Sequence, residues 1–285
     1  MATKQTTVQD HESDLGAWMI VRREPPPALR PYVTGYSGYL ERERSFARHL
    51  QPASTRIPLI INLGALYRFS DPDGSEHRIG SFAAGLHDRP TLVGSDGPQH
   101  CLQADLTPLG ARRIFNLPMH QLTNRVVELD DLFGHEAPLL VEQLYETPTW
   151  DARFSLFSRL LATRLIQAPE VPPDIAQAWD RLEQSGGSAS IGNLTRELGW
   201  SHRHLIAQFR EHTGLPPKKL ARILRFERAI ASLHGRERVC LATVAQSTGY
   251  FDQAHLHRDF REFAGRTPAD LLQRRLPDLD GLIGD

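Results

Sequence analysis

Short segments rich in β-branched and aromatic residues occupy the first third of the chain, and helical patterns occupy most of the rest. The strand-like segments are separated by glycine, proline, asparagine and aspartate, which favour turns. They cover residues 32–40, 56–63, 66–70, 78–86, 91–93 and 100–106. This series predicts a small antiparallel β-sheet or barrel.

After residue 108 the apolar positions recur at spacings of three and four, which predicts helices. We expect helices over residues 109–116, 119–123, 129–133, 137–145 and 150–166. The last of these carries an apolar stripe made of Phe154, Phe157, Leu160, Leu161 and Leu165. A face buried within the monomer and a dimer-forming pair of helices explain this stripe almost equally well.

A helix-turn-helix pattern lies near the end of the chain, in the stretch 249–268, GYFDQAHLHRDFREFAGRTP. Leu256, Phe260 and Phe263 share one helical face, and Asp252 is placed to be the N-cap of that helix. Gly249 stands where the chain turns between this helix and a shorter one that ends near Thr248. The second helix of such a motif can enter a DNA major groove.

The same pattern occurs once before in the chain. Leu205, Phe209 and Gly214 lie 51 positions before Leu256, Phe260 and Gly265, whereas Gly199 lies 50 positions before Gly249. The second copy therefore has one additional turn residue. A single glycine between helical patterns is weak evidence, but two copies in register favour a duplicated helix-turn-helix.

These residues closely resemble the AraC/XylS family of bacterial transcription regulators. The stretch 249–268 resembles the family's second motif, LTRELGWSHRHLIAQFREHTG resembles its first, and LARILRFERAIASL resembles the helix that joins them. Thr195 departs from the pattern, because it stands at a usual alanine. The resemblance covers about residues 175–275 and implies sequence-specific binding to double-stranded promoter DNA. It further implies activation as the direction of regulation, contact with RNA polymerase, and a homodimer.

A looser resemblance covers about residues 18–168. The segment FNLPMHQLTNRVVELDDLFG, preceded by LTPLGARRIF, is similar to the barrel-like sensory half of a subset of AraC-type regulators. It implies a regulatory or dimerising module without naming its ligand. Two interpretations stay open here: a sensor with a small-molecule effector, and a constitutive DNA-binding dimer without one.

Composition and charge sharpen the division of the chain. Residues 175–276 hold 16 lysines and arginines against 10 acidic residues, a charge of +6, whereas residues 1–174 carry −4 and residues 277–285 carry −3. We therefore expect an α+β protein in which the basic charge lies with the DNA-binding half. The expected parts are a disordered tail (1–17), an N-terminal sensory or dimerisation domain (18–168), a linker (169–174), an all-α DNA-binding domain (175–276) and an acidic tail (277–285).

Helix geometry selects the residues expected to contact DNA. With Leu205 and Leu256 pointing inward at about 100° per residue, the outward positions of both recognition helices follow. Ser201 is the expected N-cap of the first, and the linking helix over 217–233, about 25 Å long, adds positive charge. The candidate DNA-binding residues are Ser201, His202, Arg203, Ile206, Ala207, Arg210, Lys218, Lys219, Gln253, Ala254, His257, Arg258 and Arg261.

Side-chain chemistry separates these candidates by role. Arg203 and Arg258 can each make two hydrogen bonds to guanine, and Gln253 can do so to adenine. Ile206 and Ala207 can only meet a thymine methyl group, so the first helix is expected to discriminate less than the second. Arg210 and Arg261 are expected phosphate contacts. In the linking helix, Arg225 is placed either to add charge or to brace the two motifs.

A barrel enzyme with a bound metal is the main competing interpretation, because 13 histidines are available. His87, His100, His120 and His135 lie apart, without an HxH or HxxxH pair among them, and His202 and His204 face different sides of a helix. The spacing therefore predicts no metal, no cofactor and no enzyme. The two cysteines, Cys101 and Cys240, fall in different domains, and no apolar run approaches 18 residues. We expect a cytoplasmic protein without a membrane span.

Overall fold

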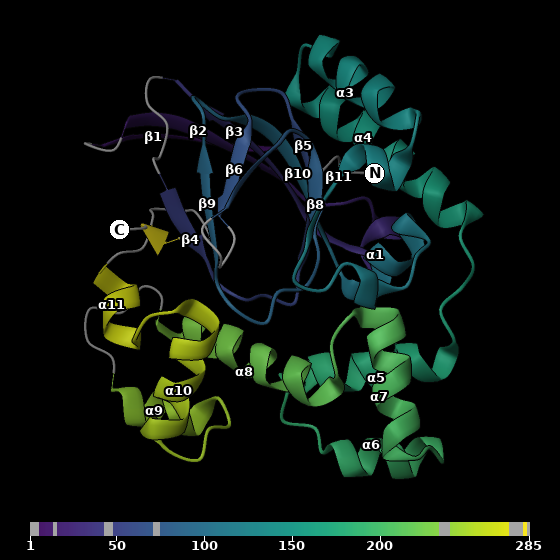
Figure 1. Cartoon of the computed structure of the whole chain (residues 1–285), viewed down its shortest axis with the longest axis vertical. Helices are drawn as coiled ribbons and strands as arrows, with labels where there is room; N and C mark the ends of the chain where they lie inside the picture. Colours follow the sequence, from purple (N-terminus) through teal and green to yellow (C-terminus); the bar gives the residue numbers. More distant parts are fainter. Residues whose placement is uncertain are drawn as a thin grey trace.

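The computed structural model describes residues 6–13, 16–42, 48–70, 75–233, 240–273 and 282–283. Two antiparallel β-sheets face each other in the N-terminal half (Figure 1). The larger sheet has the order β1-β2-β3-β10-β5-β8-β11, and the smaller has the order β12-β4-β9-β6-β7. The strands are β1 (Thr7–Ser13), β2 (Gly16–Arg23), β3 (Val33–Glu41), β4 (Arg48–Gln51), β5 (Ile57–Asn62), β6 (Tyr67–Ser70), β7 (Glu76–Ile79), β8 (Phe82–Ala84), β9 (Thr91–Ser95), β10 (His100–Leu106), β11 (Val126–Glu128) and β12 (Leu282–Ile283).

Strand alternation divides the side chains of the larger sheet between two environments. In β10, Leu102 and Ala104 join the core that the helices cover, whereas Cys101 joins a separate cluster between the two sheets. That second cluster also contains Phe82 from the larger sheet and Phe69 from the smaller, whose rings meet edge to face at 5.1 Å. The expected antiparallel sheet or barrel is confirmed as this pair of facing sheets.

Helices cover the outer face of the larger sheet (Figure 1). They are η1 (Pro27–Leu29), α1 (Pro108–Phe115), η2 (Met119–Gln121), α2 (Leu129–Phe133), α3 (Glu136–Glu146) and α4 (Trp150–Gln167). On α4, the side chains of Phe154 and Phe157 are fully buried and lie about 6 Å from the ring of Tyr36. The apolar stripe of this helix is therefore a face buried within the monomer, and it lends no support to a helix pair between two chains.

In the C-terminal half, the elements that the structure describes are helices, apart from β12. Its helices are α5 (Pro173–Gln184), α6 (Ile191–Leu198), α7 (His202–Thr213), α8 (Pro217–Leu233), α9 (Leu241–Ser247), α10 (Gln253–Ala264) and α11 (Pro268–Gln273). The linking helix α8 has the predicted bounds and runs between two helical lobes (Figure 1). The overall α+β class is as expected. Among the described residues, no helix has the length and apolar character that crossing a membrane requires.

The two expected tails need correction. Within the first of them, residues 7–13 form β1, which pairs with β2 along its whole length. A polar sequence suits an edge strand, because its backbone is bonded on one side while its side chains stay in water. Within the second, residues 282 and 283 pair with β4. The rest of both expected tails lies outside the described residues, except Thr6 and residues 16–17, the latter at the start of β2.

The strand expected over 78–86 is two strands. β7 belongs to the smaller sheet and β8 to the larger one, and the chain crosses between them at Gly80 and Ser81. Ser81 stabilises this corner, since its hydroxyl accepts the amide of Asn62 at 2.9 Å and its carbonyl accepts the amide of Leu129 at 2.9 Å. The sequence pattern does not reveal this change of sheet, because Ile79 before the corner and Phe82 after it are both buried and read as one apolar segment.

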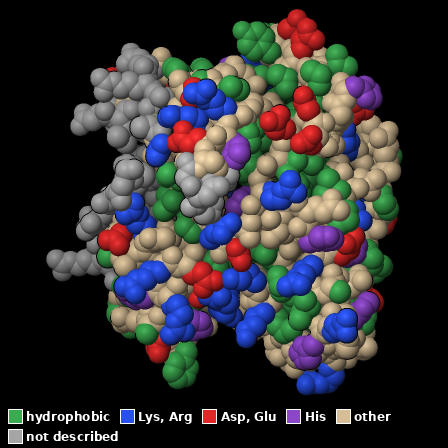
Figure 2. Space-filling view, viewed as in Figure 1, with side chains coloured by type: hydrophobic (Ala, Val, Ile, Leu, Met, Phe, Trp, Pro, Cys, Tyr) green, Lys and Arg blue, Asp and Glu red, His purple; other side chains and the backbone are tan. Residues whose placement is uncertain are grey.

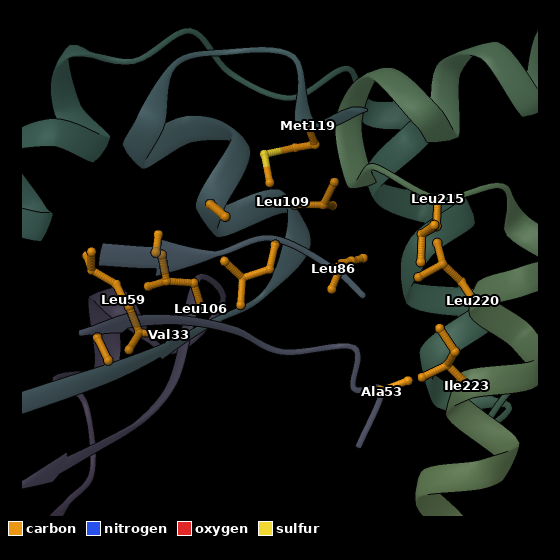
Figure 3. Packing of buried hydrophobic residues seen from close by; sticks show 14 of the residues in the cluster. Val33, Ala53, Leu59, Leu86, Leu106, Leu109, Met119, Leu215, Leu220 and Ile223 are labelled. Atoms are coloured by element: carbon orange, nitrogen blue, oxygen red, sulfur yellow. The ribbon is translucent and has the colours of Figure 1, made fainter. Parts of the chain in front are cut away.

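One hydrophobic core extends through both halves of the chain. Ala53 and Leu86 of the N-terminal half lie opposite Leu215, Leu220 and Ile223 of the C-terminal half (Figure 3). All five side chains are at most 4% exposed. The two halves are therefore joined by apolar packing as well as by the segment between α4 and α5.

Candidate nucleic-acid interface

Both helix-turn-helix motifs turn at a glycine in the left-handed region. Gly199 has φ 65° and Gly249 has φ 84°. The amide that follows each glycine donates back into the preceding helix, from Trp200 to the Thr195 carbonyl and from Tyr250 to the Ala245 carbonyl, each at 2.9 Å. A left-handed glycine ends a helix in this way without the strain that a side chain would add. The duplication inferred from sequence is thus present in the backbone.

The recognition helices α7 and α10 begin with equivalent caps. The Ser201 hydroxyl accepts the amide of His204 at 3.2 Å, and the Asp252 carboxylate accepts the amide of His255 at 2.7 Å. Both predicted N-caps are therefore confirmed. Only Trp200 separates the turn glycine from the cap in the first motif, whereas Tyr250 and Phe251 do so in the second. The additional turn residue predicted for the second motif is also confirmed.

A pair of aromatic rings repeats between the motifs. Trp200 lies 4.6 Å from His204, centroid to centroid, and Tyr250 lies 5.1 Å from His255. Both pairs are nearly perpendicular, at 81° and 82°. Edge-to-face contact fixes the first turn of each recognition helix against its own turn segment. The sequence shows an aromatic residue after each turn glycine and a histidine four or five positions later, but this repeat alone does not predict contact between the rings.

The recognition helices bury the expected faces. Leu205, Phe209, Leu256, Phe260 and Phe263 are all fully buried. Most candidate DNA-binding side chains lie on the opposite, exposed faces, and basic side chains are spread over this lower half of the molecule (Figure 2). The exposed candidates are Ser201, His202, Arg203, Ile206, Ala207, Arg210, Lys218, Gln253, Ala254, Arg258 and Arg261, whereas His257 and Lys219 are half-buried.

Lys219 has partners within the protein, unlike the free cation expected from sequence. Its ammonium lies 2.7 Å from the Glu262 carboxylate and 3.4 Å from that of Asp88 in the N-terminal half. Lys219 thus joins α8 to α10 and to the opposite domain. Lys218, which is exposed one position earlier, is the better candidate for a phosphate contact. Adjacent positions on a helix face differently, which explains why only one of the two lysines is engaged.

A buried ion pair holds α10 against α8. Arg222 donates to Asp259, which is 0% exposed, at 2.6 Å, and also to Glu262. Burial opposes the charge of Arg222, but its hydrogen bonds to Glu262 and Asp259 outweigh that effect and raise its pKa. For Glu262, burial acts to raise the pKa, and the bonds from Arg222 and Lys219 more than offset it, so that pKa is lowered. The charged state of the cluster is therefore favoured.

Arg225 braces the two motifs. Its guanidinium donates to the Gly187 carbonyl after α5 at 3.0 Å and lies 5.9 Å from the centre of the Tyr250 ring. Gly187 precedes the first motif, and Tyr250 belongs to the turn of the second. Of the two roles expected for Arg225, added charge or a brace between the motifs, the structure shows the brace. This contact helps to set the position of one recognition helix relative to the other.

The N-terminal half contacts the C-terminal end of each recognition helix. The Thr123 hydroxyl donates to the carbonyl of Gly214, the residue that ends α7, at 2.8 Å. The Ala53 amide donates to the Phe263 carbonyl, in the last turn of α10, at 2.8 Å. Both helices are thus held by the same domain, at the ends opposite to their N-caps.

A third connection reaches the linking helix. Glu227 of α8 accepts three hydrogen bonds from the loop before β5, which we call the Glu227 contact. The Ser54 hydroxyl donates at 2.7 Å, the Thr55 amide at 2.8 Å and the Thr55 hydroxyl at 2.7 Å. Because the Glu227 carboxylate accepts three hydrogen bonds, it favours a single position of this loop relative to α8.

A cavity of about 1350 Å³ extends from between the two sheets to the linking helix. Its inner end is aromatic, with Tyr39, Tyr67 and Phe82, and its outer end includes Leu224 and Glu227 of α8. His49 also lines it. Removal from bulk water lowers the pKa of His49 to about 4, so the imidazole is neutral at pH 7. The cavity therefore joins the sheets to the same helix that carries the Glu227 contact.

The four scattered histidines of the competing metal-enzyme interpretation lie apart, and His135 stands at the start of α3. His87 contacts the Gly85 carbonyl at 2.8 Å, His100 contacts Arg153 at 3.0 Å, and His120 lies 3.5 Å from Glu211. Within the described ranges, no three residues of the metal-binding types come together. The cavity histidine His49 is likewise not part of such a group.

Two features of the site were not predicted from the sequence. The Glu227 contact joins residues more than 170 positions apart, which leaves no local pattern. Phe251, 93% exposed, was recognisable only as an additional turn residue. The 51-residue register was the available signal, because it marks position 251 as having no equivalent in the first motif.

Two protein-family models match the chain. Residues 194–274 match a helix-turn-helix domain, and residues 21–128 match a domain of unknown function, DUF6597. A search of curated proteins finds no significant match. The first match includes both recognition helices, and the second includes the larger sheet from the end of β2 onward.

Solved structures resemble the chain at low identity. ToxT from Vibrio cholerae is 9% identical, with a TM-score of 0.49 over 84% of this chain and 97% of that one. The AraC-like transcriptional activator CuxR is 14% identical, with a TM-score of 0.32 over 71% and 80%. An oxalate decarboxylase from Lactobacillus farciminis is 9% identical, with a TM-score of 0.26 over 56% and 43%.

The class of the C-terminal half follows from its geometry and its family match. Residues 194–274 form a helix-turn-helix domain, with two motifs that share their turns, caps and aromatic pairs. Domains of this kind bind DNA with the second helix of a motif in the major groove.

Proposed function

We propose that α7 and α10 enter two successive major grooves of promoter DNA and read its sequence. The observation that carries this proposal is the pair of equivalently capped helices whose polar faces are exposed. The guanidinium groups of Arg203 and Arg258 form no ion pair with any other described residue. The 17-residue helix between the motifs, α8, is about 25 Å long, which suits a separation of roughly one DNA turn, about 34 Å.

The exposed side chains divide into two groups by chemistry. Arg203 and Arg258 bind guanine edges, Gln253 binds adenine, and Ile206 meets a thymine methyl group. The side chains that also contact bases or lie close to them in this proposal are His202, Ala207, Ala254 and His257. The capping Ser201 and the cations Arg210, Lys218 and Arg261 contact the phosphate backbone, where a cation adds affinity without sequence preference.

The N-terminal half acts as a sensor in this proposal. A small and largely apolar effector occupies the cavity, since aromatic side chains line its inner end. An effector that reaches the outer end touches α8 and the loop of the Glu227 contact. Because the same half of the chain also binds the ends of α7 and α10, a shift there changes how the recognition helices meet DNA.

Further parts of the proposal concern organisation and partners. We assign sensing to residues 18–168, connection to 169–174 and DNA binding to 175–276, with α5 already beginning at Pro173. The regulator works as a homodimer, which the exposed apolar residues Tyr145 and Ile166 of α3 and α4 support. It activates transcription in the cytoplasm by contact with RNA polymerase.

Selection of bound duplexes from a random DNA pool tests this function. The full-length protein is used at one fixed salt concentration, because phosphate contacts make affinity depend on salt. We expect enrichment of a motif with two parts about 10 base pairs apart. The double variant Arg203→Ala/Arg258→Ala should enrich no such motif, whereas Arg159→Ala, at an exposed arginine of α4, should enrich the wild-type motif. Failure of the wild-type protein to enrich any motif would refute sequence-specific binding.

A further inference from the structure

Phe251 is an aromatic side chain almost fully in water. It is 93% exposed, the largest value among the large apolar residues that the structure describes as exposed. Its neighbour Tyr250 is 5% exposed and packs against His255. Full exposure of an aromatic ring forgoes the free energy that burial would provide, so a partner outside the chain would stabilise it.

The position of Phe251 indicates which partner that is. It directly precedes Asp252, the N-cap of α10, and Gln253 and Ala254 after the cap are exposed as well. The N-terminal residues of a recognition helix are those that face base edges in the major groove. An exposed ring at this point therefore lies where the second motif meets DNA.

The first motif has no equivalent side chain. Trp200 leads directly to the cap Ser201, and its ring packs on His204 in the way that Tyr250 packs on His255. Phe251 is the residue that makes the second turn longer. The additional residue does not stabilise the turn through packing, since its side chain is left in solvent.

We propose that Phe251 reads a thymine by contact with its C5 methyl group at the edge of the sequence bound by α10. The ring has no hydrogen-bonding group, and the thymine methyl is the apolar group that the major groove presents. The second motif would then specify one base more than the first. This inference rests on the proposed DNA-binding function.

The test uses the sequence that the full-length protein selects from random DNA. Each thymine in the part bound by α10 is replaced in turn by deoxyuracil, which removes only the methyl group. For the wild-type protein, one replacement should weaken binding by about fourfold, as expected for burial of one methyl group. Phe251→Ala should bind the unmodified duplex about tenfold more weakly and should show no further loss with deoxyuracil at that position.

A matched control separates this role from general effects. Val8→Ala shortens another exposed apolar side chain, 53% exposed on β1 and far from α10 in the sequence, and should change neither affinity nor the response to deoxyuracil. Thermal melting of both variants should match the wild type, because both side chains lie in solvent. Unchanged affinity of Phe251→Ala, or equal losses on selected and random DNA, would overturn the inference while leaving the proposed function intact. If the wild-type protein selects no sequence at all, the proposed function itself is wrong, and the inference falls with it.

Discussion

At the scale of single residues, the site separates side chains that stabilise the protein from side chains left for a partner. Arg222, Lys219 and Arg225 are engaged with carboxylates or carbonyls inside the fold. Arg203 and Arg258 have no such partner among the described residues. Positive charge alone does not make this distinction, since all five residues lie in the basic half of the chain.

Replacement of Arg258 should affect sequence preference, and replacement of Lys218 should not. Arg258→Ala is expected to cost about 1–3 kcal/mol of binding free energy and to relax preference at one base pair. Lys218→Ala should weaken binding to all sequences alike and reduce the slope of affinity against salt by about one ion. Titrations of selected and random duplexes at several salt concentrations measure both effects. Equal losses of Arg258→Ala on the two duplexes would refute base contact.

His49 should make stability depend on pH. Burial lowers the folded-state pKa to about 4, below the ordinary value of about 6.5, so the unfolded chain binds the proton more readily. The free energy of unfolding should therefore fall as pH decreases from about 6.5 to about 4, by at most about 3 kcal/mol from this group. His49→Asn should lose this part of the dependence.

Denaturant unfolding at closely spaced pH values measures the effect of His49. The variant Gln253→Ala, at an exposed position of α10 that carries no titratable group, should retain the wild-type pH profile. A profile of His49→Asn that parallels the wild type between pH 4 and 6.5 would contradict the role assigned to burial.

At the scale of elements, local patterns predicted most helices and their caps. Ser201 and Asp252 were identified as N-caps because a short polar side chain preceded an apolar period, and α8 has the predicted ends. Local patterns did not predict elements whose structure depends on pairing between strands. The polar residues of β1 are held by backbone bonds to β2, and the segment 78–86 changes sheet at Gly80 and Ser81 although apolar residues continue on both sides.

The Glu227 contact should restrain the loop that joins β4 to β5. Glu227→Ala removes the acceptor for Ser54 and for both donors of Thr55, which is only 7% exposed. Leaving buried donors unsatisfied costs about 1–3 kcal/mol, so local opening should become more frequent.

Hydrogen exchange of the full-length protein measures this opening. Peptides that cover residues 52–56 should exchange faster in Glu227→Ala than in the wild type. Glu197→Ala breaks the exposed ion pair with Arg181 and should leave those peptides unchanged. Identical exchange of residues 52–56 in wild type and Glu227→Ala would show that this contact does not hold the loop.

At the scale of the whole molecule, the two halves form one packed structure. The sequence predicts a linker over residues 169–174 between an N-terminal domain and a DNA-binding domain, and says nothing of packing between them. The core continues from Met119 to Leu215, and the N-terminal half bonds the ends of both recognition helices. These contacts join segments far apart in the chain, so no pattern within either segment could predict them. They give the N-terminal half a direct connection to both recognition helices.

Methylation protection of guanine N7 tests the central claim most directly, since this atom lies in the major groove. On the selected duplex, the full-length protein should protect guanines in two groups about 10 base pairs apart on one face of the DNA. Arg203→Ala should lose protection in one group and Arg258→Ala in the other. Protection confined to a single group, or loss of both groups in either variant with the protein still bound, would contradict two recognition helices in successive major grooves.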